Sequence, residues 1–407
     1  MAGTGERMRA WSGPAVFSFG FRPFFLLAGI WAALAMLLWL VMLSGRAPLP
    51  TAFDPVSWHG HEMLFGYLGA VATGFLLTAV PNWTGGLPVT GWPLAGMSGL
   101  WLAGRLAVAV SALLPWAVVV LADLALPAAL AGFLAREILR GRNWRNLPVL
   151  GLVLGFGLAN LLYHVDAARG GYAAGGAGLR LGLGVAVMLI ALIGGRIVPS
   201  FTRNWLVQRG SPARPAPMGR ADGAVLALTG VALVLWVPAP GAVLTAPLLA
   251  LAGLAHLWRL SRWSGRHTAA EPLVWVLHAG YAFVGAGFLA LAAAAFAPAM
   301  APAAQHVWMA GAVGLMTLAV MTRASLGHAG RPLTASRPVT ALYLALILSV
   351  LARVAAGAMP GATWFLHLAA GGWILAFGGF AVIYWPILTR PRARGPKPSA
   401  PPGRPAG

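Results

Sequence analysis

Long apolar runs alternate along this chain with short segments that carry most of its charge. An α-helix rises about 1.5 Å per residue, so roughly 20 apolar residues span the hydrocarbon core of a bilayer. We predict a membrane helix over each of these runs: 23–44, 58–80, 92–112, 114–135, 147–166, 178–199, 222–238, 241–259, 272–297, 304–325, 338–357 and 363–388. The pattern therefore predicts an all-α membrane protein, a polytopic bundle of about twelve transmembrane helices within 23–389.

Composition agrees with lipid as the main solvent of this chain. Hydrophobic types make up 59% of the 407 residues and charged types only 9%, whereas a soluble domain carries about 25% charged residues. The net charge of +20 comes from arginines between the apolar runs and in the tails. No basic face is interleaved with aromatic residues, so we expect a bilayer partner and no nucleic acid.

The distribution of arginine predicts the orientation, because cytoplasmic loops carry an excess of basic residues. The fourth, sixth, eighth and tenth loops are basic, whereas the seventh, ninth and eleventh contain neither lysine nor arginine. Two loops fit poorly, since the second has no basic residue and the fifth has Arg169. We expect both termini in the cytoplasm of a bacterial cell, with a multi-pass inner-membrane domain between an N-terminal arm (1–22) and a disordered, basic, Pro-rich tail (390–407).

This orientation sorts the nine histidines into two groups at opposite ends of the bundle. The periplasmic group is His59, His61, His164, His306 and His367, and the cytoplasmic group is His256, His267, His278 and His328. The chain contains no cysteine. This composition excludes disulfides, iron–sulfur clusters and thiolate-ligated haem, so any metal must be held by His, Met, Asp, Glu or Tyr.

The strongest local motif is WHGHEMLFG at 58–66, which opens the second predicted helix after a plausible N-cap at Asp54 and Pro55. On a helix His59 and His61 lie about 200° apart, so we expect them to serve different ligand sites. Interfacial histidines that bond headgroups or backbone are the alternative. Position 65 is Phe65, so the motif is not that of a zinc protease.

Two further patterns carry alternatives. His61, Gly66 and Gly69 recur in spacing as His306, Gly311 and Gly314. Glycine stripes of this kind allow either close helix packing or the approach of a flat macrocycle.

Charges inside the predicted spans form the other pattern. Asp123, Arg105 and Arg353 lie within apolar runs, where an unpaired charge is costly. Either an arginine pairs with Asp123, or the arginines hold haem propionates and Asp123 relays protons.

Several blocks of the chain resemble the NnrS family of bacterial membrane proteins. They are FSFGFRPFF (17–25), WHGHEMLFGYLGAVATGFLLTAVPNWTG (58–85), Asn160 with His164, GGRIVPSFTRN (194–204), His278 with Tyr281, QHVWMAGAVGLMTLAVMTRASLGHAGRPL (305–333) and IYWPIL (383–388). The resemblance implies a haem- and copper-containing inner-membrane protein linked to nitric oxide metabolism and nitrosative stress. A fainter likeness to the haem–copper oxidase core is architectural only, because the sixth predicted helix has no histidine.

With that resemblance, imidazole ligation assigns candidate residues. We expect haem at His61 and His306, with Arg105 and Arg353 toward its propionates, and copper at His59, His164 and His367. His278 with His328 is a candidate second cofactor site at the cytoplasmic end. The expected function is to bind or turn over nitric oxide or a related small ligand, with an electron donor, or to protect against nitrosative stress. The alternatives are a twelve-helix secondary transporter without haem, and a sensor or assembly factor without turnover.

Overall fold

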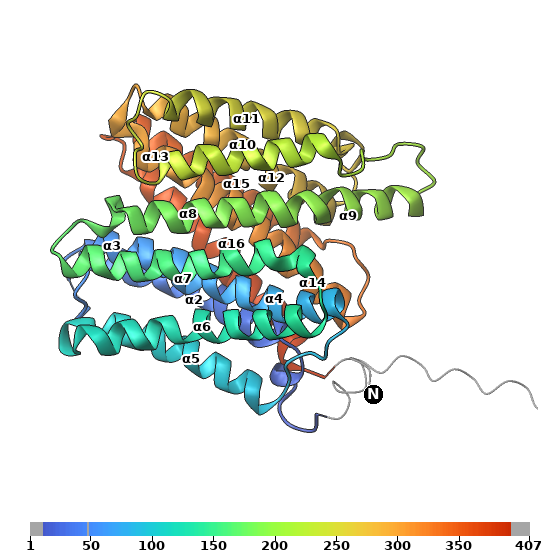
Figure 1. The fold of residues 1–407 in the computed structure, drawn as a ribbon, viewed down its shortest axis with the longest axis horizontal. Helices are drawn as coiled ribbons and strands as arrows, with labels where there is room; N and C mark the ends of the chain where they lie inside the picture. The colour runs from blue at the N-terminus through green and yellow to red at the C-terminus, as the bar shows by residue number, and fades with distance from the viewer. Residues whose placement is uncertain (1–10, 47–48, 392–407) are drawn as a thin grey trace, which may run out of the picture.

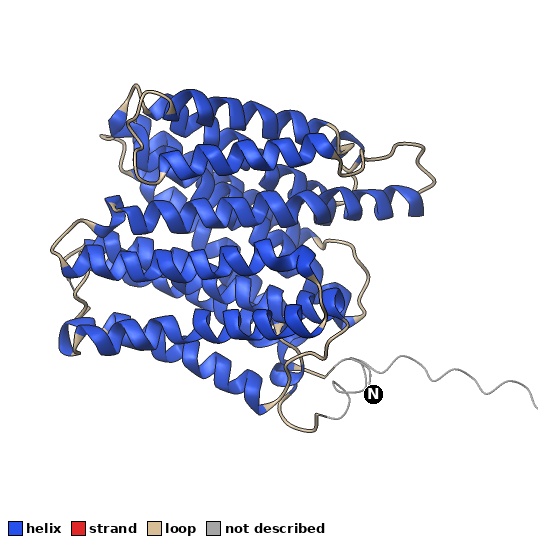
Figure 2. Cartoon of the chain, in the orientation of Figure 1, coloured by secondary structure: helices blue, strands red, loops and turns tan. Residues whose placement is uncertain are grey.

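The computed structural model describes residues 11–46 and 49–391, and within them the chain is helical with no strand (Figure 2). Residues 1–10 of the expected N-terminal arm and 392–407 of the expected tail lie outside the described residues. The described part contains twelve long helical spans in the predicted order. They are α2 (Phe21–Leu43), α3–η2–α4 (Pro55–His61, Glu62–Leu68, Gly69–Thr84), α5 (Trp92–Ala109), α6 (Trp116–Arg140), α7 (Leu147–Ala168), α8–η6–α9 (Ala177–Leu189, Ile190–Gly194, Gly195–Gln208), α10 (Arg220–Trp236), α11 (Thr245–Ser261), α12 (Pro272–Ala294), α13–η9–α14 (Ala301–His306, Val307–Leu315, Met316–Ala329), α15 (Arg337–Ala358) and α16 (Trp364–Thr389).

The prediction of a polytopic helical membrane protein is therefore confirmed. Among the described residues, nine spans are long and apolar enough to cross a membrane. The other three are α5, α10 and α11, with 18, 17 and 17 residues. Which end faces the cytoplasm remains a prediction from the arginines.

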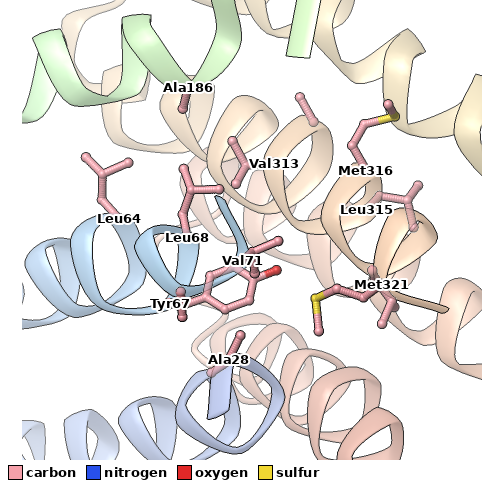
Figure 3. Packing of buried hydrophobic residues seen from close by; sticks show 14 of the residues in the cluster. Ala28, Leu64, Tyr67, Leu68, Val71, Ala186, Val313, Leu315, Met316 and Met321 are labelled. Carbon is pink, nitrogen blue, oxygen red and sulfur yellow. The ribbon is translucent and has the colours of Figure 1, made fainter. Parts of the chain in front are cut away.

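The spans pack as three rows of four (Figure 1). Within the described chain the rows run α5–α6–α7–α8, α10–α11–α12–η9 and α15–α16–α2–α4. The last span of each row contains a π-helical segment, namely η2, η6 or η9. These three spans meet at the centre, where Leu64 and Leu68 of η2 lie near Ala186 of α8 and Val313 of η9 (Figure 3).

The π-helical segments change which backbone groups are available to neighbouring helices. A π-helix uses i→i+5 hydrogen bonds, so it interrupts the regular α-helical ladder, and such segments are frequent at functional sites. The Gly66 carbonyl in η2 accepts from Trp101 Nε1 at 2.9 Å. The Ala191 carbonyl in η6 accepts from the Arg259 guanidinium at 2.9 Å. The central spans are thus tied to the outer helices by polar contacts as well as by apolar packing.

The start of α3 fixes where His59 and His61 lie. Asp54 Oδ1 accepts from the backbone N–H groups of Val56 and Ser57 at 3.0 and 2.9 Å, and Pro55 occupies the first helical position. This is the predicted N-cap, which satisfies amide groups that have no partner inside the helix. Both histidines are thereby placed at the end of the bundle where α3 and α13 lie, on the left in Figure 1.

Candidate metal centre

A buried polar cluster lies at the α3 end of the bundle. Its six side chains come from α3, η2, α5, α6 and α7, and each residue is between 0% and 4% exposed. They are His61, Glu62, Arg105, Asp123, Asn160 and His164. Groups this polar are stable away from water only when they are paired with one another or bind an ion.

Asp123 is the meeting point of this cluster. Its Oδ2 atom lies 3.0 Å from His61 Nε2 and 2.9 Å from His164 Nε2. One ligand atom from each of the three residues lies within 4.8 Å of the other two. Two imidazoles and one carboxylate that converge in this way can bind a transition-metal ion.

Three more side chains orient these candidate ligands. Glu62 Oε1 lies 3.0 Å from His61 Nδ1, so a proton on Nδ1 is donated to the carboxylate and Nε2 presents its lone pair toward Asp123. Asn160 Nδ2 donates to Asp123 Oδ2 at 2.8 Å. Arg105 donates to Glu62 Oε1 at 2.5 Å and also to Asp123 Oδ1. Of the two alternatives for Arg105, the structure therefore has the pairing with Asp123.

The charges of this cluster do not sum to zero when both imidazoles are neutral. Glu62 and Asp123 contribute two negative charges, and Arg105 contributes one positive charge. A buried excess charge is unfavourable in a medium of low dielectric constant. One further cation, either a bound metal ion or a proton on an imidazole, would balance the cluster.

A cavity of about 40 Å³ adjoins the cluster between η2, α4, α5, α6 and α7. Arg105, Asp123 and Asn160 line one part of it, and the rest of its wall is mostly apolar, with Leu68 and Phe156 among the lining residues. A water molecule needs roughly 10–15 Å³ on this measure. The cavity can hold two or three waters or a diatomic molecule, and it is too small for a macrocycle.

The other expected periplasmic histidines are arranged differently from the prediction. His61 contacts α6 and α7, whereas the ring beside His306 is that of His59, with 6.5 Å between the ring centroids. The expected pairing of His61 with His306 is therefore not present in the structure. His59 and His61 do serve different neighbours, as their angular separation predicts. His367 is exposed at the start of α16.

The expected site at the opposite end is not assembled as one cluster by any contact of the described residues. His278 Nε2 lies 2.8 Å from Thr202 Oγ1. His328 packs against the rings of Phe19 and Phe21, with centroids 5.1 and 5.3 Å away. The assignment of a cofactor to His278 and His328 remains a prediction.

The glycine stripes serve packing in this structure. A Cβ atom added at Gly66 would lie 2.7 Å from Glu62 Oε2 and 2.9 Å from Arg105 NH1. One added at Gly311 would lie 2.7 Å from the Phe283 ring. Gly66 thus makes room for the polar cluster, whereas Gly311 makes room for an aromatic ring.

Sequence reasoning did not include Glu62 and Asn160 among the site residues. The available signal was their position as polar residues inside apolar runs. Asn160 also lies four residues before His164, which puts both on the same face of α7.

Comparison with known families gives one match over nearly the whole chain. Residues 15–392 match the family model described as NnrS protein. Comparison with curated proteins gives no match.

Proposed function

The chain belongs to the NnrS family, and from that premise we propose that it is an inner-membrane metalloprotein that binds nitric oxide or a related small ligand. The family suggests a function related to nitric oxide. We place the binding centre at His61, Asp123 and His164. The observation that carries this assignment is the convergence of their ligand atoms within 4.8 Å, next to a small, largely apolar cavity.

The donor set suits a single transition-metal ion. Imidazole is a good ligand for copper, and two histidines with one carboxylate also form the ligand set of many non-haem iron sites. The resemblance implies copper, and metal analysis distinguishes it from iron. Bound there, the ion would supply an open coordination position for a small ligand. The adjoining cavity cannot hold a macrocycle, so we do not assign haem to this centre.

The surrounding residues of the chain would prepare the site before a ligand arrives. Glu62 holds the His61 ring so that Nε2 faces the centre, and Asn160 holds the Asp123 carboxylate. Partners of this kind tune metal affinity by about 10–100-fold. Arg105 offsets part of the negative charge, so the cluster favours a cation of low charge.

The cavity supports a ligand that is small and weakly polar. Such molecules partition readily from water into apolar surroundings, and the bilayer around the helices is a ready source of them. Arg105 and Asn160 line the cavity and carry N–H groups that could donate to an oxygen or nitrogen atom of a bound ligand.

A twelve-helix transporter without a metal is the competing function. A transporter could use the same buried charges to bind a substrate cation, but it would not need a metal ion. The purified protein distinguishes the two, because a coloured, metal-containing protein favours the metalloprotein and a colourless, metal-free one favours the transporter.

The test compares His164→Gln with His367→Gln in detergent-purified protein. We expect His164→Gln to lose the ion and its optical change on addition of nitric oxide, because it removes one of three ligands. His367→Gln changes an exposed histidine outside the cluster and should retain both. Equal metal content in the wild type and both variants would refute the proposed centre.

A further inference from the structure

A second pair of histidines lies at the same end of the bundle, outside the cluster around Asp123. His59 belongs to α3 and His306 ends α13, 247 residues later in the sequence. Their rings are nearly parallel, with 11° between the planes and 6.5 Å between the centroids. A metal ion bound roughly 2 Å from each of two facing imidazole nitrogens would separate the centroids by about 6 Å. The spacing therefore suits one metal ion between the rings.

Each ring has a nitrogen available for such an ion. His306 Nδ1 lies 2.6 Å from the Pro302 carbonyl oxygen and donates its proton to it. This hydrogen bond fixes the tautomer, so Nε2 carries a lone pair. His59 Nδ1 is buried and has no hydrogen-bond partner in the described part of the chain. A buried, unpartnered nitrogen is costly unless a ligand occupies it.

The surroundings of this pair favour an anionic partner. Arg353 is close enough to interact electrostatically with both imidazoles. Among the described residues Arg353 forms no ion pair. Trp39 stacks on His59 with centroids 4.1 Å apart, and its indole N–H is likewise buried without a partner. A guanidinium and an indole N–H beside two metal-binding nitrogens match a carboxylate-bearing metal complex.

We propose that His59 and His306 are the two axial ligands of a haem, with Arg353 paired to a propionate. Haem iron accepts two imidazole ligands, and Arg pairs carboxylates through a planar fork of donors. A bare metal ion would add positive charge next to Arg353, whereas haem brings two carboxylates that neutralise it. His59, His306 and Trp39 are only partly buried, so a flat ligand has access to them.

The test uses the full-length protein, with His59→Ala and His306→Ala as variants and His367→Ala as the matched control. Haem per polypeptide is measured by the optical spectrum of extracted haem, and the spin state by electron paramagnetic resonance. We expect low-spin haem in the wild type and the control, and at least roughly tenfold less haem in each variant. Added imidazole should restore a low-spin signal, because it can occupy the space of the deleted ring.

Two outcomes overturn the proposal. One is wild-type protein that contains no haem, or haem that survives both substitutions unchanged. The other is loss of a bare ion, but not of haem, on substitution of His59 or His306. If either alanine variant fails to accumulate, Arg353→Met takes its place. It should accelerate transfer of haem to an external acceptor about tenfold, and an unchanged rate counts against the propionate pairing.

This inference is independent of the centre at His61, Asp123 and His164. In the His59 and His306 variants the ion bound at that centre should remain, and in His164→Gln the haem should remain. Loss of one cofactor without the other identifies which of the two assignments has failed.

Discussion

His164 Nε2 lies 2.9 Å from Asp123 Oδ2, although the two residues are 41 positions apart and belong to successive helices. The same oxygen is within 3.0 Å of His61 Nε2, which comes from a third helix. One carboxylate thus collects both imidazoles of the centre. Changes at Asp123 should therefore affect metal binding more directly than changes at any other position.

The first prediction is that Asp123→Asn abolishes metal binding at this centre while the fold persists. The amide keeps the shape of the side chain but is a poor metal ligand and lacks the charge. Without Asp123, Glu62 and Arg105 still balance each other. We expect metal content to fall at least roughly tenfold, with a thermal midpoint close to that of the wild type, measured by elemental analysis and thermal unfolding.

The matched control is Asp222→Asn, which changes another buried aspartate paired with an arginine, Arg259, in α10 and α11. This variant should retain the metal. Retention of metal in Asp123→Asn would show that the two histidines bind it without the carboxylate, and would contradict the proposed ligand set.

The second prediction concerns Arg105, whose guanidinium holds two buried carboxylates. Arg105→Met leaves Glu62 and Asp123 without their shared cation, which should cost roughly 3–5 kcal/mol of unfolding free energy. Adding Glu62→Gln removes one of the stranded charges and should recover most of that loss. The measurement is denaturant unfolding of the single and double variants in detergent.

Arg353→Met is the comparison for this prediction, because Arg353 has no ion pair among the described residues and its loss should not strand a protein carboxylate. If Arg105→Met proves as stable as Arg353→Met, the Arg105 pairs contribute no net stability. In that case the double variant should show no recovery.

The sequence predicted the helices well but not the histidine pairings, for a physical reason. Runs such as 58–80 and 304–325 report how long a helix is, and the 100° step per residue reports that His59 and His61 face apart. Neither property says which helix lies opposite each face. That depends on how the three rows of helices pack, so His306 was expected beside His61 when the structure has it beside His59.

The π-helical segments were also beyond the sequence pattern. Glu62–Leu68 directly follows His61, and it changes the angular position of every later side chain on that span relative to a regular α-helix. The buried charges, by contrast, were a usable signal. Asp123 and Arg105 stood out because an unpaired charge in an apolar run is costly, and the structure does pair them.

The third prediction is the topology, which rests on the arginine distribution. Reporter fusions after Arg145, Arg220, Arg266 and Arg337 should report the cytoplasm. Fusions near Pro240, Pro302 and Gly361 should report the periplasm. The physical reason is that basic loops are retained on the cytoplasmic side. Inverted reporters at the basic loops would place both histidine pairs of the α3 end on the cytoplasmic side.

The fourth prediction is that Gly69→Leu closes the cavity beside the metal centre. Gly69 lines the cavity, and a Cβ atom added there would meet only the Phe156 ring, at 3.9 Å. The backbone can therefore accept a side chain, and the remaining carbons must enter the cavity. We expect nitric oxide binding to weaken at least roughly tenfold, as filled space excludes the ligand, with metal content unchanged because no candidate ligand moves. The measurement is optical titration with nitric oxide alongside elemental analysis.

Gly99→Leu is the control, because Gly99 is exposed on α5 and a Cβ atom added there meets nothing within 4 Å. It makes the same chemical change on the outer surface and should leave ligand binding intact. Xenon provides a check that does not depend on the metal, since apolar cavities bind it. Xenon should enter the wild type and Gly99→Leu but not Gly69→Leu. If Gly69→Leu excludes xenon and still binds nitric oxide with wild-type affinity, the ligand reaches the metal from another side and the cavity is not its binding site.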